Sequence, residues 1–162
     1  MTTLFFNSDF RLAQLAREAE SWLGTPFWAH SCAKGPSGGV DCVHLVQDIL
    51  VSCGAMKRQV LPAFPMDWGD HRSESAVLGV FTNNAYFREH FLPLPHPENQ
   101  PKPGDILCFK HGVCVHHIGL VLPGAHFVHA LKPDGVAIMP LDVALYGKKV
   151  LGEVVRLYRP VH

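Results

Sequence analysis

The stretch that decides the fold is GVDCVHLV, residues 39–46, which ends a glycine-rich loop and begins a helical pattern. Apolar residues recur at helical spacing as far as Cys53, and Gly54 can end the helix in the left-handed conformation. Asp41 is a good N-cap because its carboxylate can accept hydrogen bonds from the unpaired amides of the first turn. Cys42 is then the first helical residue. A thiol there feels the positive end of the peptide dipoles, which predicts a lowered pKa and a reactive thiolate.

The same position also offers the backbone amide of Cys42 to an oxyanion that develops during acyl transfer. The alternative is a buried, inert cysteine, which is the commoner state of this residue type. Position alone therefore leaves both interpretations open.

Two histidines supply the base and the orienting group that a cysteine nucleophile needs. In the expected strand His117–Leu122 side chains alternate, so His117 and Gly119 share a face, and the glycine leaves room for a helix end or a substrate. A Pro-Gly turn brings the next strand alongside, and that strand carries His129. The two imidazoles can then form a hydrogen bond, which leaves the second ring nitrogen of His117 for Cys42. This arrangement would be a catalytic triad with a histidine as its third member, whereas each histidine taken alone is more commonly a structural or surface residue.

The rest of the chain predicts helices followed by a run of antiparallel strands, which is an α+β plan. The five prolines between residues 93 and 103 predict a non-helical connector across the surface. The expected helices span about residues 9–23, 41–53 and 74–91. The expected strands span residues 106–110, 117–122, 126–131, 136–139 and 150–158.

Composition indicates one globular domain spanning residues 1–162. Lys plus Arg and Asp plus Glu both number 14, so no charge imbalance favours nucleic acid or a membrane surface as partner. The five cysteines form no C-x-x-C pair, which favours a reducing compartment. The first ten residues lack the basic region and apolar run of a signal peptide. The expected location is the cytoplasm, with delivery by a phage particle or secretion system as a route outward.

A metal site is one alternative, because His111, Cys114, His116 and His117 lie close together in the sequence. One strand cannot present all four side chains on the same face, and their spacing fits no standard zinc pattern. The sequence therefore predicts no metal and no other cofactor.

Five blocks together resemble the NlpC-type cysteine peptidases, a papain-like family of cell-wall endopeptidases. The family motifs are "LGTPY", "DCSGLV", "PGDLV", "HVGIY" and "FIHA", in this order. The matching blocks are LGTPF (23–27), DCVHLV (41–46), PGDIL (103–107), HIGLV (117–121) and FVHA (127–130).

This resemblance implies a papain-like α+β fold in which N-terminal helices pack on an antiparallel sheet of five to six strands. It implies that Cys42 is the nucleophile, His117 the base and His129 the third member. The implied activity is a cysteine endopeptidase or amidase that hydrolyses amide bonds in peptidoglycan stem peptides without a cofactor. The resemblance is strongest to single-domain phage-tail-associated members, which implies a phage-tail or secretion-apparatus partner.

The chain departs from the family pattern around the expected substrate site. Val43 and His44 replace the Ser-Gly pair after the nucleophile, and Phe27 replaces a tyrosine. Together with Trp28 and Asp41 they are the residues expected to border the substrate. These changes leave two further alternatives open: a catalytically inactive structural or binding module of the same fold, and an acyl hydrolase with a non-wall substrate.

Overall fold

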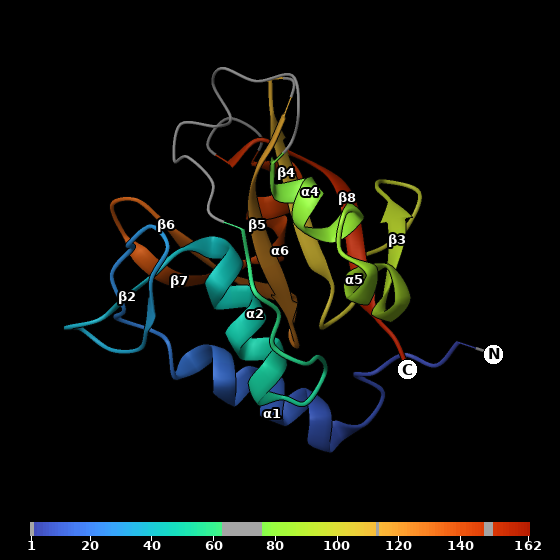
Figure 1. Ribbon diagram of the computed structural model, residues 1–162, viewed down its shortest axis with the longest axis horizontal. Helices are drawn as coiled ribbons and strands as arrows, with labels where there is room; N and C mark the ends of the chain where they lie inside the picture. Colours follow the sequence, from blue (N-terminus) through green and yellow to red (C-terminus); the bar gives the residue numbers. More distant parts are fainter. Residues whose placement is uncertain (1, 63–75, 113, 148–150) are drawn as a thin grey trace.

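The computed structural model describes residues 2–62, 76–112, 114–147 and 151–162. Helices and strands mix in the expected α+β manner (Figure 1). Their order along the chain is α1 (Asp9–Glu20), β1 (Cys32–Ala33), β2 (Gly39–Val40), α2 (Cys42–Ser52), α4 (Ala76–Thr82), α5 (Ala85–His90), β3 (Phe91–Pro95), β4 (Ile106–His111), β5 (Cys114–Leu122), β6 (His126–Leu131), β7 (Gly135–Pro140), α6 (Leu141–Tyr146) and β8 (Glu153–Pro160).

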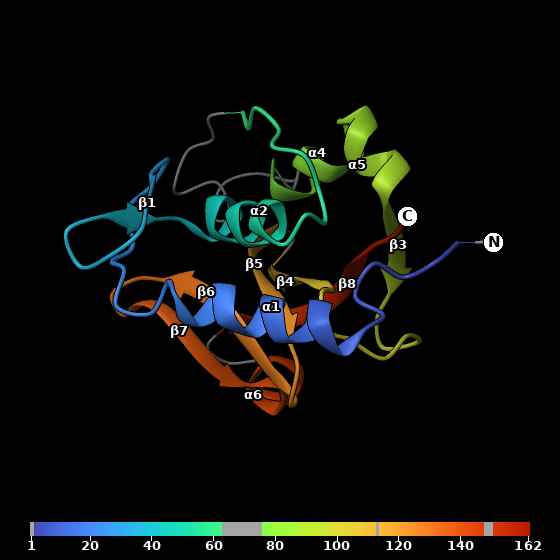
Figure 2. The same ribbon diagram turned by 90° about the horizontal axis from the view of Figure 1, so that it is seen from below.

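The main sheet has six strands in the order β3-β8-β4-β5-β6-β7, and every neighbouring pair is antiparallel. Helices α1 and α2 cover one face, and the short helix α6 covers the other (Figure 2). Each face buries its own apolar cluster, the larger one beneath α1, α2, α4 and α5. The predicted packing of N-terminal helices on an antiparallel sheet of five to six strands is confirmed.

The two N-terminal helices form where the sequence predicts them. Helix α1 is capped by Ser8, whose side chain accepts the Arg11 amide at 3.3 Å, and it ends three residues before the predicted boundary. Helix α2 has Asp41 as its N-cap, and Gly54 after it adopts a φ of 75°. Seven of the eleven residues of α2 are buried, because the helix lies between α1 and the sheet.

Three predictions need correction. The proline-rich connector contains an edge strand: β3 pairs with β8, and Pro93 and Pro95 fit because an edge strand leaves one side of its backbone unpaired. The expected helix 74–91 is two short helices separated by a break before the N-cap Asn84, and residues 74–75 lie outside the described residues. Helix α6 was not predicted. The last strand begins at Glu153 rather than at residue 150, which also lies outside the described residues.

A buried ion pair fastens the start of β4 to β8. Asp105 is fully buried, and the Arg159 guanidinium donates to both of its carboxylate oxygens at 2.8 and 2.7 Å. The chain ends also meet, because Leu4 and Val161 form a β-bridge.

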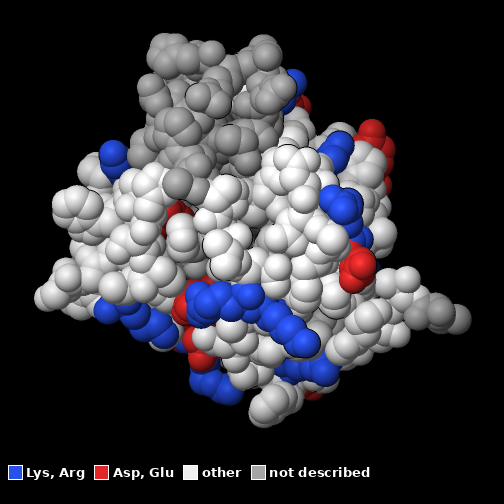
Figure 3. All heavy atoms as spheres, in the orientation of Figure 1, with Lys and Arg blue, Asp and Glu red and all other residues white. Residues whose placement is uncertain are grey.

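The surface carries no large region of one charge on the face drawn in Figure 3. Uncharged side chains dominate it, and the basic side chains near α1 are accompanied by acidic ones. Among the described helices, none is long and apolar enough to cross a membrane.

Candidate active site

Cys42 lies at the N-terminus of α2, as predicted, and its side chain is buried in the larger apolar cluster. The residue is only 6% exposed. Its thiol is close enough to the backbone amide of Ile118 for that amide to stabilise a thiolate. Ile118 directly follows His117 in β5, so the helix terminus brings the thiol beside the strand that carries the predicted base.

The expected low pKa of Cys42 is wrong for this structure. Burial raises the pKa of the thiol to about 12, because a desolvated thiolate loses its hydration. The amides of Ile118, Cys42 and Val43 act in the opposite direction, but they do not offset the burial, and the Asp41 carboxylate raises the pKa further. The helix N-terminus alone therefore does not produce a thiolate, and the Cys42 thiol is neutral in this structure.

His117 and His129 form the predicted pair on the neighbouring strands β5 and β6. Nε2 of His117 lies 2.9 Å from Nδ1 of His129, and each residue is 3% exposed. Their rings pack against the aromatic side chains of Phe109 and Phe127. Burial lowers the pKa of His117 well below its usual range and that of His129 to about 4. Both imidazoles are therefore neutral at pH 7, as a general base must be.

The second contact of the predicted triad, between Cys42 and His117, is not a hydrogen bond in this structure. Among the described residues, no hydrogen bond joins the Cys42 thiol to His117, so their catalytic roles and that of His129 stay predictions.

The interpretation of Gly119 needs correction. A Cβ there would lie 3.1 Å from the Phe127 ring and 3.3 Å from the Val128 carbonyl oxygen, so this glycine makes room for the neighbouring strand β6 rather than for a helix end.

Asp41 does more than cap α2. One carboxylate oxygen accepts the amide of His44 at 2.8 Å, and the other accepts the amide of His30 at 2.8 Å. Nδ1 of His44 lies 2.8 Å from both oxygens. The carboxylate is nearly fully buried, whereas the His44 side chain is 22% exposed. Asp41 thus ties the preceding loop to the helix that carries Cys42, and the sequence indicated only the cap.

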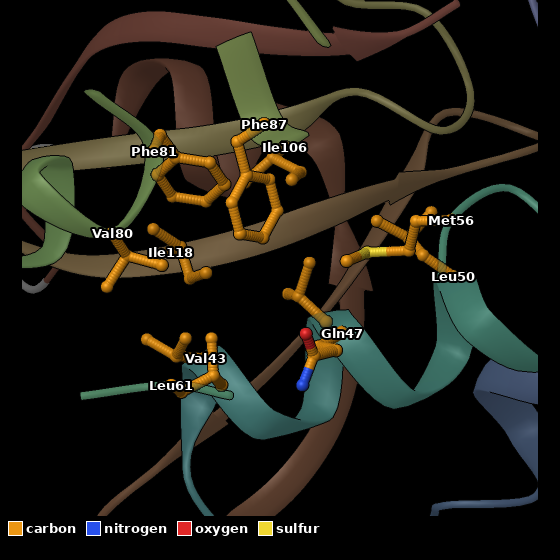
Figure 4. A pocket seen from close by; sticks show the side chains of 11 residues that line it. Val43, Gln47, Leu50, Met56, Leu61, Val80, Phe81, Phe87, Ile106 and Ile118 are labelled. Atoms are coloured by element: carbon orange, nitrogen blue, oxygen red, sulfur yellow. The ribbon is translucent and has the colours of Figure 1, made fainter. Parts of the chain in front are cut away.

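The other expected substrate residues lie in different surroundings. Trp28 is 64% exposed, and Phe27 packs partly against the apolar cluster, with the Lys132 ammonium 5.6 Å from its ring centroid. Val43 is buried and lines an apolar pocket between α2 and the sheet, where it faces Ile118 (Figure 4). A serine at position 43 would place its hydroxyl in that apolar pocket, so the valine fits its surroundings.

The alternative metal site has no support in the described part of the chain, where no three His, Cys, Asp or Glu side chains are grouped to hold an ion. His111 and His116 are ring neighbours, with centroids 5.3 Å apart. Nε2 of His116 lies 3.1 Å from the Leu151 carbonyl oxygen.

The solved structures that share this fold include the following three. A Staphylococcus aureus protein described as similar to a lipoprotein of the NLP/P60 family has 20% identity and a TM-score of 0.55, over 99% of this chain and 44% of that one. NlpC1 from Trichomonas vaginalis has 16% identity and a TM-score of 0.57, over 91% and 43%. The peptidoglycan hydrolase RipB from Mycobacterium tuberculosis has 18% identity and a TM-score of 0.52, over 94% and 66%. This chain thus spans less than two thirds of the length of each.

No curated protein matches the sequence significantly. The sequence model of the NlpC/P60 family matches residues 24–155, which is most of the chain and includes the blocks that carry Cys42, His117 and His129. The chain belongs to the NlpC/P60 family.

Proposed function

We propose that this protein is a cysteine peptidase or amidase that hydrolyses an amide bond in a peptidoglycan stem peptide. The observation that carries the proposal is the hydrogen-bonded pair of neutral imidazoles, His117 on β5 and His129 on β6, where β5 lies beside the helix terminus that carries Cys42. The family supplies the reaction class, and the hydrolase RipB, whose fold is shared, supplies the precedent for the wall substrate.

The proposed reaction begins from a neutral thiol and a neutral imidazole. Sγ of Cys42 attacks the carbonyl carbon of the amide while His117 accepts the thiol proton. If Nε2 of His117 donates to His129, then Nδ1 of His117 is free to accept this proton. The C–N bond of the tetrahedral intermediate breaks, and the leaving amine takes the proton back from His117. Water, deprotonated by His117, then hydrolyses the thioester and releases the acid and the thiol.

Each neighbouring group has a defined part in this scheme. The backbone amide of Cys42, at the positive end of α2, stabilises the developing oxyanion. His129 holds the tautomer and ring angle of His117 and favours the imidazolium that forms. Because the thiol is not hydrogen-bonded to His117 at rest, the two side chains must approach each other when the substrate binds.

One observation favours a second function. The pKa of Cys42 is raised to about 12, and a buried neutral thiol is also what an inactive binding module of this fold would contain. An experiment on catalysis therefore has to separate these two functions directly.

The test uses two cysteines of one helix. Cys53 follows the last residue of α2, is 5% exposed, and has a pKa raised to about 12, as Cys42 does. The wild type, Cys42→Ala and Cys53→Ala are incubated with purified peptidoglycan and with γ-glutamyl peptides, and released fragments are identified by mass spectrometry. We expect Cys42→Ala to lose at least about 10⁴-fold in kcat/KM and Cys53→Ala less than about threefold.

The outcomes discriminate between the proposals. Equal activity of wild type and Cys42→Ala would reject the nucleophile. Absence of hydrolysis by the wild type on several wall chemotypes, with no acyl-enzyme trapped at Cys42, would favour the binding module. Hydrolysis of a non-wall amide alone would keep the enzyme and reject the wall substrate.

A further inference from the structure

A second pocket lies over the β3–β8 edge of the sheet, beneath α4 and α5. Its aromatic part consists of Phe81, Phe87 and Phe91, each no more than 3% exposed. Its cavity volume is about 330 Å³, which is within the range of small-molecule sites. The pocket also contains two arginines, Arg88 and Arg156.

This pocket is separate from the site around Cys42. Strand β4 lies between β8 and β5 in the sheet, so the pocket and the imidazole pair occupy different parts of it. Tyr158 and Arg156 are two residues apart in β8, and their side chains therefore point to the same face. The register pairs Tyr158 with Pro93 of β3, and Figure 1 shows α4 and α5 beside these strands.

The two arginines of the pocket lack anionic partners. Nη1 of Arg88 donates to the Thr82 carbonyl oxygen at 2.7 Å, and no carboxylate pairs with Arg88 or Arg156 among the described residues. By contrast, Arg58 and Arg159 each form an ion pair with an aspartate, at 2.6 and 2.7 Å. The pocket thus presents two guanidinium groups without counter-charge beside an apolar surface.

Tyr158 gives an independent indication of a ligand. The residue is 4% exposed, its ring stacks on Phe81 with centroids 4.5 Å apart, and its hydroxyl has no partner at hydrogen-bond geometry among the described residues. Burial raises the pKa of this hydroxyl, and the nearby guanidinium of Arg156 opposes the rise without forming a well-aligned hydrogen bond. A buried hydroxyl without a partner is costly, so such groups are rare in folded proteins. An acceptor atom that enters the pocket would satisfy this hydroxyl and meet the guanidinium of Arg156 nearby.

We propose that this pocket binds an amphipathic organic anion, with its apolar body on the phenylalanine rings and its carboxylate or phosphate between Arg88, Arg156 and the Tyr158 hydroxyl. The rings bury apolar surface of the ligand, whereas charge-assisted hydrogen bonds fix its anionic end. The site is independent of the reaction at Cys42, because it shares none of the residues assigned to that reaction.

The probe for this site is 1-anilinonaphthalene-8-sulfonate, whose fluorescence rises in apolar surroundings, and N-phenyl-1-naphthylamine is its uncharged counterpart. Titrations compare the wild type with Arg156→Gln, Arg88→Gln and Tyr158→Phe. Arg17→Gln changes an exposed arginine of α1 and is the matched control. We expect one saturable site for the sulfonate, with Kd raised about tenfold in each pocket arginine variant, about threefold in Tyr158→Phe, and unchanged in Arg17→Gln.

The uncharged probe should bind all variants alike. Decanoate or decyl phosphate should displace the sulfonate, and the tighter competitor identifies the anionic group, whereas decanol should compete weakly. Without ligand, Tyr158→Phe should melt at or above the wild-type temperature, because it removes a buried hydroxyl that lacks a partner. Absence of saturable sulfonate binding, or a Kd that is equal in wild type and both pocket arginine variants, would overturn the proposal.

Discussion

The two ends of helix α2 each carry a buried cysteine, and the two residues are alike in burial and pKa but differ in their polar surroundings. Cys42 at the start and Cys53 after the end are 6% and 5% exposed, and burial is the first cause that raises the pKa of each to about 12. Three backbone amides act on Cys42 to lower its pKa. The charges that act on Cys53 are those of Glu18 and Arg17 on α1, in opposite directions.

This difference indicates that burial sets the protonation state of a thiol at rest. The polar groups around the thiol determine whether it can react as a nucleophile. Cys42 has a capped helix terminus on one side and, on the other, two neighbouring strands that each carry one imidazole of the pair. Cys53 has neither. If the proposed function is right, reactivity at Cys42 depends on the imidazole pair and the cap, and changes to these groups should affect Cys42 and leave Cys53 unaffected.

Among changes to the surroundings of Cys42, the largest expected effect is at the imidazole pair. His117→Ala should lower kcat/KM about 10³- to 10⁴-fold, because it removes the group that accepts the thiol proton. His129→Gln should cost about 10- to 100-fold, because an amide can still hold the ring of His117 but cannot favour its imidazolium as well. Hydrolysis rates of a γ-glutamyl peptide measure both. A larger loss of kcat/KM in His129→Gln than in His117→Ala would mean that His129 is the base and His117 the residue that orients it.

Acid should destabilise the fold through the same pair. The pKa of His129 falls from 6.5 to about 4 on folding, and that of His117 also falls. Between pH 6.5 and 4 the unfolded chain binds protons that the folded chain does not, so the free energy of unfolding decreases as the pH falls. For His129 alone the shift corresponds to about 3 kcal/mol.

Urea unfolding, followed by tryptophan fluorescence between pH 7 and 4, measures this dependence. His129→Gln should flatten the curve, whereas His126→Gln, which changes an exposed residue of the same strand, should not. A wild-type stability that stays constant over this range would contradict the burial of neutral imidazoles. Cys53 contributes nothing here, because a thiol does not titrate between pH 7 and 4.

The next effect concerns the helix cap. Asp41→Asn keeps one acceptor oxygen but loses the other, so the amides of His30 and His44 can no longer both be satisfied. We expect a loss of about 1–2 kcal/mol in unfolding free energy and a changed rate of iodoacetamide labelling at Cys42 relative to Cys53. Ser8→Ala removes the side-chain cap of α1, costs about 1 kcal/mol, and should leave that ratio unchanged. If the labelling rate of Cys42 relative to Cys53 were the same in both variants, Asp41 would act only as a helix cap.

The sequence predicted the parts of this site that depend on local pattern. The cap and the start of α2 follow from Asp41 and the helical spacing after it, and the pairing of His117 with His129 follows from alternation in two strands joined by a short turn. The pKa of Cys42 could not be predicted, because it depends on how tightly α2 packs on β5. Helix α6 was missed because it has six residues and no side-chain cap. Strand β3 was missed because its prolines are typical of loops.

The smallest expected effect separates two roles of His44. Nδ1 of this residue contacts Asp41, whereas its Nε2 has no hydrogen-bond partner among the described residues. His44→Asn places an amide near the position of Nδ1 and removes Nε2, whereas His44→Gln does the reverse.

If His44 borders the substrate, His44→Asn should raise KM about three- to fivefold with kcat unchanged, because the lost contact stabilises the bound substrate and the transition state equally. His44→Gln should keep KM and lose about 1 kcal/mol of stability. Michaelis–Menten kinetics on a γ-glutamyl peptide, beside thermal melting, measure both changes. An unchanged KM in His44→Asn would leave His44 as a support of Asp41 alone, and the substrate contacts would then have to come from the exposed Trp28 and its loop.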